Sequence, residues 1–362
     1  MGYEIDFLPV GNGERSGDAI ALRIGNLLAN PIQQTVVVID GGFQETGQEL
    51  VDHIKKFYNT ERVDLAVSTH SDADHAGGLT FLLEQMEVGQ LWMHKPWEHA
   101  TNMARMFTDG RVTDNSLSEK MRRSLENAAE LERIAKRKGI PIVEPFAGVS
   151  DPSGKVVVVG PDKQYYESLL PDFRCTPEPA TSGLTEFLKD YLAHAAEAVK
   201  KLAESWGLET LTDGGVTSAE NNSSAIIRVE LMPGKYALFT ADAGIAALTR
   251  AADYLTLFAF DFSQLNFVQV PHHGSQRNVG PTILDRLVGR KLATETVIKT
   301  AFVSAAPDGE PKHPSKKVTN AFRRRGAPVH ATQGDKKVHY QDAPNRGWGN
   351  SVALPFYQEV ED

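Results

Sequence analysis

Residues that could bind metal ions are concentrated in one short stretch, "STHSDADHAGGL", which places two histidines and two aspartates within six positions. These four residues are His70, Asp72, Asp74 and His75. Imidazole suits zinc, copper, iron and nickel, whereas carboxylate suits harder ions such as manganese and magnesium. One subset of the loop could therefore hold one ion while the other subset holds a second. The density of such residues weighs against the alternative, a hydrogen-bonded turn without metal.

Two further groups of the same residue types follow apolar, strand-like runs. Asp242 lies in "LFTADAG", and His272 and His273 lie in "VPHHGS". A lone aspartate in this position is usually a helix N-cap, but a two-ion centre needs an anion to bridge its ions. Adjacent histidines after a strand point in different directions, so one can bind metal while the other faces substrate. A structural role for the histidine pair is the alternative.

The elements around these motifs are predicted to be strands and helices in alternation. "EIDFLPV", "AIALRIG", "TVVVIDGG" and "VDLAVSTH" are expected strands, and the paired glycines after His75 permit a tight entry into a helix. The motif loop, Asp242 and the His272-His273 pair all come just after predicted buried strands. An open α/β sheet presents its ligand site at that edge. The spacing therefore predicts one site built from several strand ends.

The middle third has a different, helical character. "SLSEKMRRSLENAAELERIAKRKG" is predicted to be one helix, with a capping box at Ser116 and Glu119 and a stop at Gly139. "LTEFLKDYLAHAAEAVKKLAESWG" is expected to be a second long helix. We interpret about 101–220 as a helix-rich insertion within a single domain of 1–362. Later segments predict a hairpin in "IIRVELMPGKYALF", a helix in "HPSKKVTNAFRRRG" and a final strand pair in "APVHATQGDKKVHY".

Taken together, these motifs resemble the metallo-β-lactamase superfamily, and most closely its ComEC-like branch, the hydrolase domain of the DNA-uptake channel protein. The similar pieces are "EIDFLPVGNGERSGDAI", "VVVIDGG", "STHSDADHAGGL", "NNSSAIIRVEL", "LFTADAG", "VPHHGS" and "KHPS". The superfamily motif is His-x-His-x-Asp-His. Asp72 replaces its second histidine, as is typical of the ComEC-like branch. The resemblance implies an α/β fold, an αββα sandwich with a helical insertion in the middle third.

The resemblance also implies roles for single residues. His70 and Asp72 would serve one ion, Asp74 and His75 the other, and Asp242 would bridge the two. The ions would be zinc or manganese, with magnesium as a further option.

Other roles follow from the same resemblance. His273 is preferred over His272 as the ligand that closes the second site, which would leave His272 near the leaving group. Asp40 would support the motif loop by hydrogen bonds. Asn222 and Ser223 stand where many members carry another histidine. That replacement would leave the first ion short of a nitrogen donor and favours manganese or magnesium.

Several other polar residues are candidates for contacts with substrate or with the metal ligands. His94 could reach the site from a loop or could be an ordinary surface histidine, and Ser275 follows the histidine pair. His313 lies just before a basic helix, beside Lys312, where it could contact a substrate phosphate. The basic residues nearby form either a solvated helix face or an electropositive rim for a polyanion. They are Lys312, Lys316, Lys317, Arg323, Arg324, Arg325, Lys336 and Lys337.

These residues favour a metal-dependent phosphodiesterase, acting on DNA or RNA as a nuclease. Two ions could activate a bridging water that Asp74 orients, while His272 or His313 acts on the leaving oxygen. One alternative is hydrolysis of a small ester, lactone or phosphoester on the same centre. Another is a non-catalytic binding member of a complex, against which the complete set of ligands argues.

The overall composition restricts these options. A formal net charge of -9 excludes a protein that binds nucleic acid over its whole surface, although a local basic patch remains compatible with it. A single cysteine, Cys175, excludes an intramolecular disulfide and fits a reducing compartment. The first residues lack the features of a secretory signal, and no apolar run reaches membrane-spanning length. We therefore expect a cytoplasmic protein without a membrane role. The sequence indicates no particular protein partner.

Overall fold

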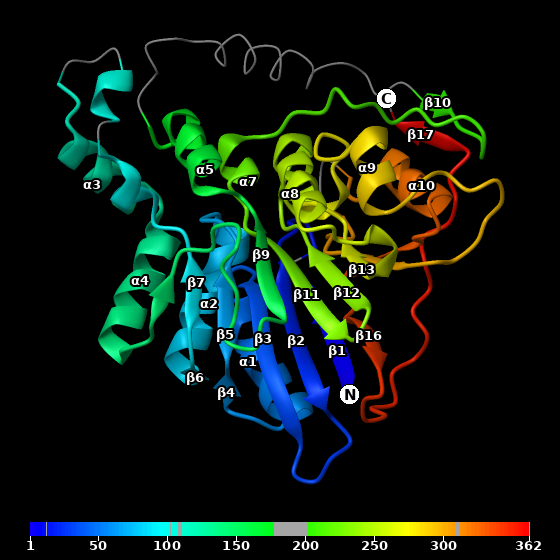
Figure 1. The fold of residues 1–362 in the computed structure, drawn as a ribbon, viewed down its shortest axis with the longest axis horizontal. Helices are drawn as coiled ribbons and strands as arrows, with labels where there is room; N and C mark the ends of the chain where they lie inside the picture. Colours follow the sequence, from blue (N-terminus) through cyan, green and yellow to red (C-terminus); the bar gives the residue numbers. More distant parts are fainter. Residues whose placement is uncertain (12, 102, 108–110, 177–200, 309–311, 362) are drawn as a thin grey trace.

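The structure is a computed structural model that describes residues 1–362 except 12, 102, 108–110, 177–200, 309–311 and 362. Two mixed β-sheets pack face to face (Figure 1). The first has the order β16 (Lys337–Gln341), β1 (Gly2–Phe7), β2 (Ala19–Asn26), β3 (Gln33–Gly41), β5 (Leu65–Ser68), β7 (Leu91–Met93) and β8 (Ile142–Val143). The second has the order β15 (Val329–Ala331), β14 (Thr300–Val303), β13 (Leu265–Gln269), β12 (Lys235–Phe239), β11 (Ile226–Met232) and β9 (Val156–Gly160).

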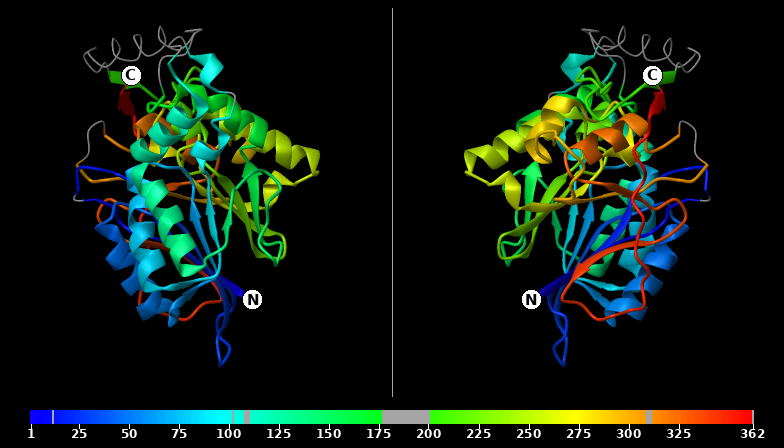
Figure 2. Two further views of the ribbon diagram at one scale, coloured as in Figure 1. Left: turned by 90° about the vertical axis from the view of Figure 1, so that its left-hand side faces the viewer. Right: turned by 90° about the vertical axis from the view of Figure 1, so that its right-hand side faces the viewer.

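A helical layer covers the outer face of each sheet, as the side views show (Figure 2). On the first sheet these are α1 (Thr46–His53), continued by a π-helical turn at Ile54–Tyr58, α2 (Ala73–Gln85) and α4 (Glu126–Lys138). On the second sheet they are α8 (Ile245–Leu257), α9 (Pro281–Leu287) and α10 (Lys316–Arg324). Two short strands, β4 (Arg62–Val63) and β6 (Glu87–Val88), pair with each other beside the first sheet.

Three apolar layers hold this arrangement together. The central layer lies between the sheets, where Ile5, Ile39 and Trp92 of the first sheet meet Val229 and Phe267 of the second, all nearly inaccessible to solvent. The other two layers lie between each sheet and its helices. Sheets in such a sandwich bury both faces, which explains their nearly continuous apolar strands. The predicted αββα sandwich is confirmed.

The predicted first long helix is wrong in one respect, because the structure divides it into α3 (Asp114–Ser124) and α4. Leu125 separates them with non-helical backbone angles (φ -101°, ψ 54°). The capping box joins Thr113 and Ser116, three residues earlier than the predicted box. The break has a packing reason, since α3 lies on the 3-10 turn Pro96–His99 whereas α4 packs on α2. Gly139 ends α4 in the left-handed conformation, as predicted (φ 69°).

Other differences arise from long-range strand pairing. Most of the second predicted helix lies outside the described residues, and its end is instead strand β10 (Lys201–Ala203), paired with β17 (Glu359–Glu361). The predicted final strand pair is also wrong, because β15 joins the second sheet and β16 the first. Between 101 and 220 the chain adds an edge strand to each sheet, β8 and β9, besides α5 (Lys163–Leu169) and α7 (Ala219–Asn222). This part of the chain therefore contributes strands to both sheets of the sandwich.

The remaining elements are short 3-10 turns at Ala104–Met106, Leu170–Asp172, Phe262–Gln264 and His272–Gly274. Strands β3 and β5 run parallel, and so do β12 and β13, so their carboxyl ends lie at one edge of each sheet. The described parts of the chain contain no helix with the length and apolar character needed to cross a bilayer.

Candidate metal centre

The backbone at the strand ends takes conformations that non-glycine residues rarely adopt. Asp40, Ala241, His272 and His273 all have positive φ angles, between 44° and 58°. Such conformations cost free energy and persist where the surrounding structure enforces them, often at functional sites. They occur here at the ends of β3, β12 and β13, and they turn the polar side chains toward one shared space.

Two glycines that face each other, Gly41 at the end of β3 and Gly78 in α2, let the segment with the motif approach this strand. A Cβ atom on Gly78 would lie 2.0 Å from the carbonyl oxygen of Gly41, and one on Gly41 would lie 2.5 Å from the backbone nitrogen of Leu79. Both contacts are impossible for a real side chain. The first turn of α2, which carries His75, can therefore approach this strand end only because both residues are glycine.

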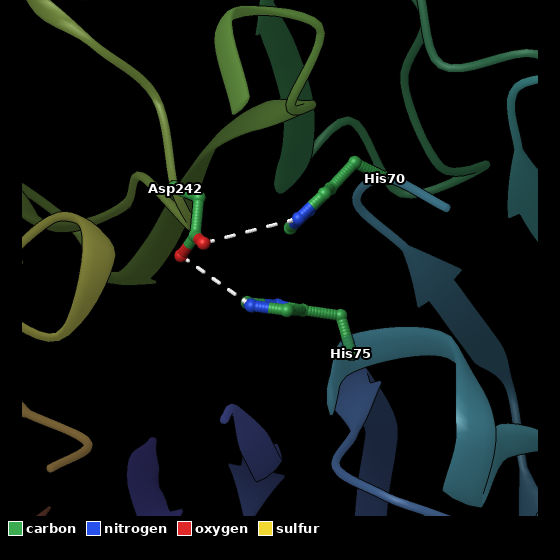
Figure 3. A group of neighbouring side chains, drawn as sticks. All are labelled: His70, His75 and Asp242. Atoms are coloured by element: carbon green, nitrogen blue, oxygen red, sulfur yellow. Dashed lines mark ion pairs between the residues drawn. The ribbon is translucent and has the colours of Figure 1, made fainter. Parts of the chain in front are cut away.

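Asp242 lies between two groups of histidines. Its Oδ2 is 3.9 Å from His70 Nε2 and 3.6 Å from His272 Nε2. Its Oδ1 is 3.4 Å from His75 Nε2 and 4.0 Å from His273 Nε2. Figure 3 shows His70 and His75 pointing at Asp242 from the motif loop and the start of α2.

Asp74 completes one of these groups, because its Oδ2 lies 3.8 Å from His75 Nε2 and 3.7 Å from His273 Nε2. We call His70, His272 and Asp242 Oδ2 the first donor set. We call His75, His273, Asp74 and Asp242 Oδ1 the second donor set. Asp242 is the only residue common to both.

The atoms that face this space fit a metal ion. His70 Nε2, His75 Nε2, His273 Nε2 and Asp242 Oδ1 are buried, and none has a hydrogen-bond partner. Unpaired buried polar atoms cost free energy. Separations of 3.4–4.0 Å are long for hydrogen bonds. Two ligands bound about 2.1 Å from a tetrahedral ion, however, lie about 3.4 Å apart.

The other nitrogen of each imidazole ring, Nδ1, forms a hydrogen bond that orients the ring. His75 Nδ1 donates to Asp40 Oδ2 over 2.8 Å, and His273 Nδ1 donates to the carbonyl oxygen of Ser304 over 2.9 Å. Carboxylates and carbonyls are the usual partners of metal-binding histidines, since they leave the lone pair of the other nitrogen free. In its neutral form, each ring therefore carries its proton on Nδ1, away from the shared space.

The histidines of the first donor set have corresponding partners. His272 Nδ1 donates to Asn278 Oδ1 over 2.9 Å. His70 Nδ1 donates to Thr69 Oγ1 over 3.1 Å, since the Thr69 hydroxyl itself donates to Asp40, and Ser224 Oγ lies 3.4 Å from the same nitrogen. All four imidazoles are therefore oriented by neighbours that lie outside the donor sets.

Without a cation, protons balance the carboxylates of the site. Burial lowers the pKa of His75, but Asp242, Asp40 and Asp74 outweigh it and raise that pKa well above its usual value. The pKa of His273 rises to about 9 because Asp242 and Asp74 outweigh burial in the same way. These histidines keep the pKa of Asp74 at about 2 despite its burial. A bound cation would displace the imidazole protons.

Asp72 lies outside both donor sets. It sits at the N-cap of α2, and its Oδ2 accepts a hydrogen bond of 2.7 Å from Arg174 Nη2. Arg174 also donates from its backbone nitrogen and from Nε to Glu220 Oε1. The carboxylate that replaces the superfamily's second histidine is thus paired with an arginine, so the structure does not place Asp72 as a ligand of the first ion.

Asn222 and Ser223 do not reach the donor sets either. Asn222 Nδ2 donates to the carbonyl oxygen of Ser218, and Ser223 Oγ donates to that of Glu220. Ser275, which follows Gly274, is buried, and its Oγ accepts a hydrogen bond from the backbone nitrogen of Arg277.

His313 and His94 lie close to the centre and are uncharged at neutral pH. The ring of His313 is 6.3 Å from that of His272, and burial, with the charges of His273 and His272, lowers its pKa to about 4. His94 stacks on Tyr166, and burial lowers its pKa to about 3. His94 and His70 line one small pocket. Lys312 beside His313 is exposed.

Neither interpretation of the basic helix holds for Arg324 and Arg325. Arg324 is buried and pairs with Glu204 at 2.9 Å. Arg325 is buried and pairs with Glu209 at 2.7 Å and Asp285 at 2.8 Å. They form neither a solvated face nor a rim for a polyanion. Lys317 is buried as well, which leaves Lys312 and Lys316 as the exposed cations at this end of α10.

Sequence reasoning missed several residues that shape the site: Asp18, Thr69, Asn221, Ser224, Gln269, Asn278 and Ser304. Asp18 is the most consequential, because its ligand-type atom lies within 4.8 Å of those of Asp242 and His273. Burial raises the pKa of Asp18, although His75 and His273 act against this. The only available signal was its place in "ERSGDAI", one of the stretches that resemble the superfamily.

Comparison with known proteins supports the class of protein that this fold and site define. Residues 28–166 match the family model of the metallo-beta-lactamase superfamily. Members of the superfamily are mostly hydrolytic enzymes and normally bind divalent metals, usually zinc. The match therefore supports a metal-dependent hydrolase in general.

No curated protein matches the chain significantly. Among solved structures, a metallo-beta-lactamase of Cronobacter sakazakii with a HARLDQ motif is 13% identical, covering 70% of this chain and 73% of its own, with a TM-score of 0.31. A metallo-beta-lactamase candidate from Thermotoga maritima is 10% identical, covering 72% of this chain and 86% of its own, with a TM-score of 0.33. These similarities are too low to carry a conclusion about function.

Proposed function

We propose that the protein is a hydrolase with a two-metal centre that cleaves phosphodiesters. One observation carries the dinuclear part of this proposal. The two carboxylate oxygens of Asp242 face different pairs of histidines, with His70 and His272 on one side and His75 and His273 on the other. A carboxylate in this position suits a bridge between two ions.

The donors favour zinc or manganese over magnesium. Each donor set combines two imidazole nitrogens with carboxylate oxygen. Imidazole suits zinc and other transition metals, whereas magnesium prefers oxygen ligands and retains much of its water. His272 would supply the first ion with the nitrogen donor that Asn222 and Ser223 do not provide.

Substrate would approach from the side of Asp74 and His272. Their side chains are 26% and 28% exposed, whereas those of His70, His75, His273 and Asp242 are at most 6% exposed. Two bound cations would supply a water nucleophile with a lowered pKa and stabilise the charge of the transition state. Asp74, at the open side, would orient that water. His313 would contact the leaving oxygen as an uncharged hydrogen-bonding group, since His272 faces Asp242.

Two observations support an anionic, phosphodiester substrate. The sequence motifs resemble the ComEC-like branch, with Asp72 as its distinctive residue, and DNA and RNA are the candidate substrates on that basis. Arg174 places a guanidinium beside the motif loop with its side chain 67% exposed. The buried arginines of α10 offer no support for a long polyanion track. A small phosphoester, ester or lactone is therefore the second candidate, and a binding role within a complex is the third.

The proposal is tested by cleavage of labelled single- and double-stranded DNA and RNA, together with a small chromogenic phosphodiester and a lactone. Metal is removed first, and zinc, manganese or magnesium is then restored one at a time. We expect zinc or manganese to restore phosphodiester cleavage in the wild type and in His330→Gln, whose ring lies outside the donor sets. Asp74→Ala and His75→Ala should be inactive. Lactone cleavage alone would replace the phosphodiester proposal, and inactivity on every substrate would leave the binding role.

A further inference from the structure

Asp18 lies at the point where the two halves of the site meet, just before β2. Its backbone nitrogen donates to the carbonyl oxygen of Asp74 over 3.1 Å, and its carbonyl oxygen accepts from the backbone nitrogen of Gly42 at 2.6 Å. A Cβ atom on Gly17 would lie 2.5 Å from that same Asp74 oxygen. The backbone of Asp18 is therefore fixed against the metal-binding loop, and its side chain is 2% exposed.

One oxygen of this carboxylate is held by Gln269 of β13. Asp18 Oδ2 accepts from Gln269 Nε2 at 2.8 Å. Gln269 Oε1 in turn accepts from the backbone nitrogens of Thr240 at 2.9 Å and Ala241 at 3.0 Å. These two bonds fix the orientation of the amide, because its oxygen must face two donors and its nitrogen must then face Asp18. The carboxylate is thus oriented by the strand that leads to the histidine pair.

The other oxygen, Oδ1, is buried and has no hydrogen-bond partner. Ligand-type atoms of Asp18, Asp242 and His273 lie within 4.8 Å of one another. Asp242 Oδ1 and His273 Nε2 are also buried and unpaired. Two buried carboxylates at this distance repel each other unless a positive charge lies between them.

We propose that Asp18 is a further metal ligand of the second donor set, bound through Oδ1. The second set then has three carboxylates, Asp18, Asp74 and Asp242, whereas the first has Asp242 alone. Carboxylates suit hard ions. Asp18 therefore makes the second position the better of the two for manganese. This inference rests on the proposed two-metal centre and adds a ligand to it.

The first test compares Asp18→Asn with the wild type. Metal-free protein is titrated with manganese in a calorimeter, which measures the affinity of each ion. Asparagine keeps the shape of the side chain and removes its charge. We expect the affinity for one of the two manganese ions to fall by about 10- to 100-fold, which is the loss seen when a group that supports a metal ligand is removed. The affinity for the other ion should stay unchanged. The metal-free variant should melt no lower than the wild type, since a buried like charge is removed.

Asp6→Asn is the matched control. Asp6 is also a fully buried aspartate, but its Oδ2 accepts hydrogen bonds from Tyr58 and His53 and lies outside the donor sets. Its variant should melt lower with and without metal and should bind manganese normally. If Asp18→Asn binds both manganese ions with wild-type affinity, Asp18 is not a ligand.

A second measurement uses the wild type and does not depend on the folding of a variant. In a crystal structure of the zinc-loaded protein, Asp18 Oδ1 should lie about 2.0–2.2 Å from the ion held by His75 and His273. Two ions with Asp18 more than about 3.5 Å from both would overturn the inference and leave the two-metal centre standing. Fewer than two ions in the wild type would instead overturn the proposed centre.

Discussion

His75 donates from Nδ1 to Asp40 Oδ2 over 2.8 Å, so its other nitrogen, Nε2, faces Asp242 and is the one that a metal ion would bind. Asp40 also accepts from the backbone nitrogen and the hydroxyl of Thr69. The carboxylate at the end of β3 thus orients both the motif loop and one metal-binding ring.

Asp40→Asn should weaken metal binding without abolishing the fold. The amide can donate to His75 Nδ1, which would move the ring proton to Nε2 and block the lone pair that faces the ion. We expect the affinity for one ion to fall by about 10- to 100-fold. Calorimetric titration of metal-free protein measures this loss. Unchanged affinity for both ions would show that Asp40 does not set the tautomer.

Arg174→Ala should impair substrate binding and leave the metals in place. Arg174 pairs with Asp72 and Glu220 at the motif loop, and neither partner belongs to a donor set. The more exposed pair with Asp72 adds little to stability, but Glu220 is buried and would keep only the backbone nitrogen of Arg174 as a donor, so we also expect a lower Tm. We expect KM for a phosphodiester to rise by roughly 10-fold, as for loss of one charge-assisted hydrogen bond, with kcat nearly constant. Steady-state kinetics measure both constants.

Arg133→Ala is the control, since Arg133 pairs with Glu130 on the exposed face of α4. Its kinetics should match those of the wild type. A fall in kcat and in bound metal in Arg174→Ala, with KM unchanged, would assign Arg174 to the support of the centre and not to substrate binding.

Metal-free protein should become less stable as the pH rises. The folded-state pKa of His273 is raised from 6.5 to about 9, and that of His75 is raised as well. Protonation of these histidines contributes its full stabilisation of the folded protein below pH 6.5. This contribution is lost as the pH rises toward 9. We expect Tm to fall by roughly 5 °C between pH 6 and pH 9. Metal-loaded protein, whose histidines carry no extra proton, should lack this fall, and differential scanning calorimetry of both forms makes the comparison.

Arg324→Met should destabilise the protein and leave metal binding unchanged. Arg324 is buried, pairs with Glu204 and donates to the carbonyl oxygens of Ser205, Trp206 and Leu208. Removal of one partner of a buried pair costs about 3–5 kcal/mol, because the other charge stays buried. Urea unfolding measures the free energy of unfolding, with the exposed Lys316→Ala as control. A stable variant that loses only affinity for nucleic acid would restore the rim interpretation of α10.

The sequence predicted the parts of the site that depend on local patterns. His70, His75, Asp242 and His273 each follow a buried apolar strand, and the parallel strands bring their carboxyl ends together. A strand's end is visible within about ten residues, which is why these four positions could be placed in advance. The expected tight entry into a helix after the two glycines is wrong in its position, because α2 already begins at Ala73 and both glycines lie within it.

The rest depends on contacts between distant segments. Asp18 and Gln269 are 251 residues apart, and nothing near Asp18 in the sequence announces that contact. Arg324 looks like part of a solvated helix until the chain around Glu204 packs over it. Asp72 has the residue type of a ligand, but Arg174, 102 residues away, binds it. Residue type and spacing cannot reveal such partners.

The bridging position of Asp242 is the central claim, and a count of bound metal tests it most directly. Wild-type protein, Asp242→Asn, His70→Ala and His273→Ala are loaded with zinc, freed of excess and assayed by mass spectrometry of the metal. The wild type should hold two ions per chain, each histidine variant one, and Asp242→Asn fewer than one. Two ions retained in Asp242→Asn, or a wild type that saturates at one, would contradict a centre bridged by this carboxylate.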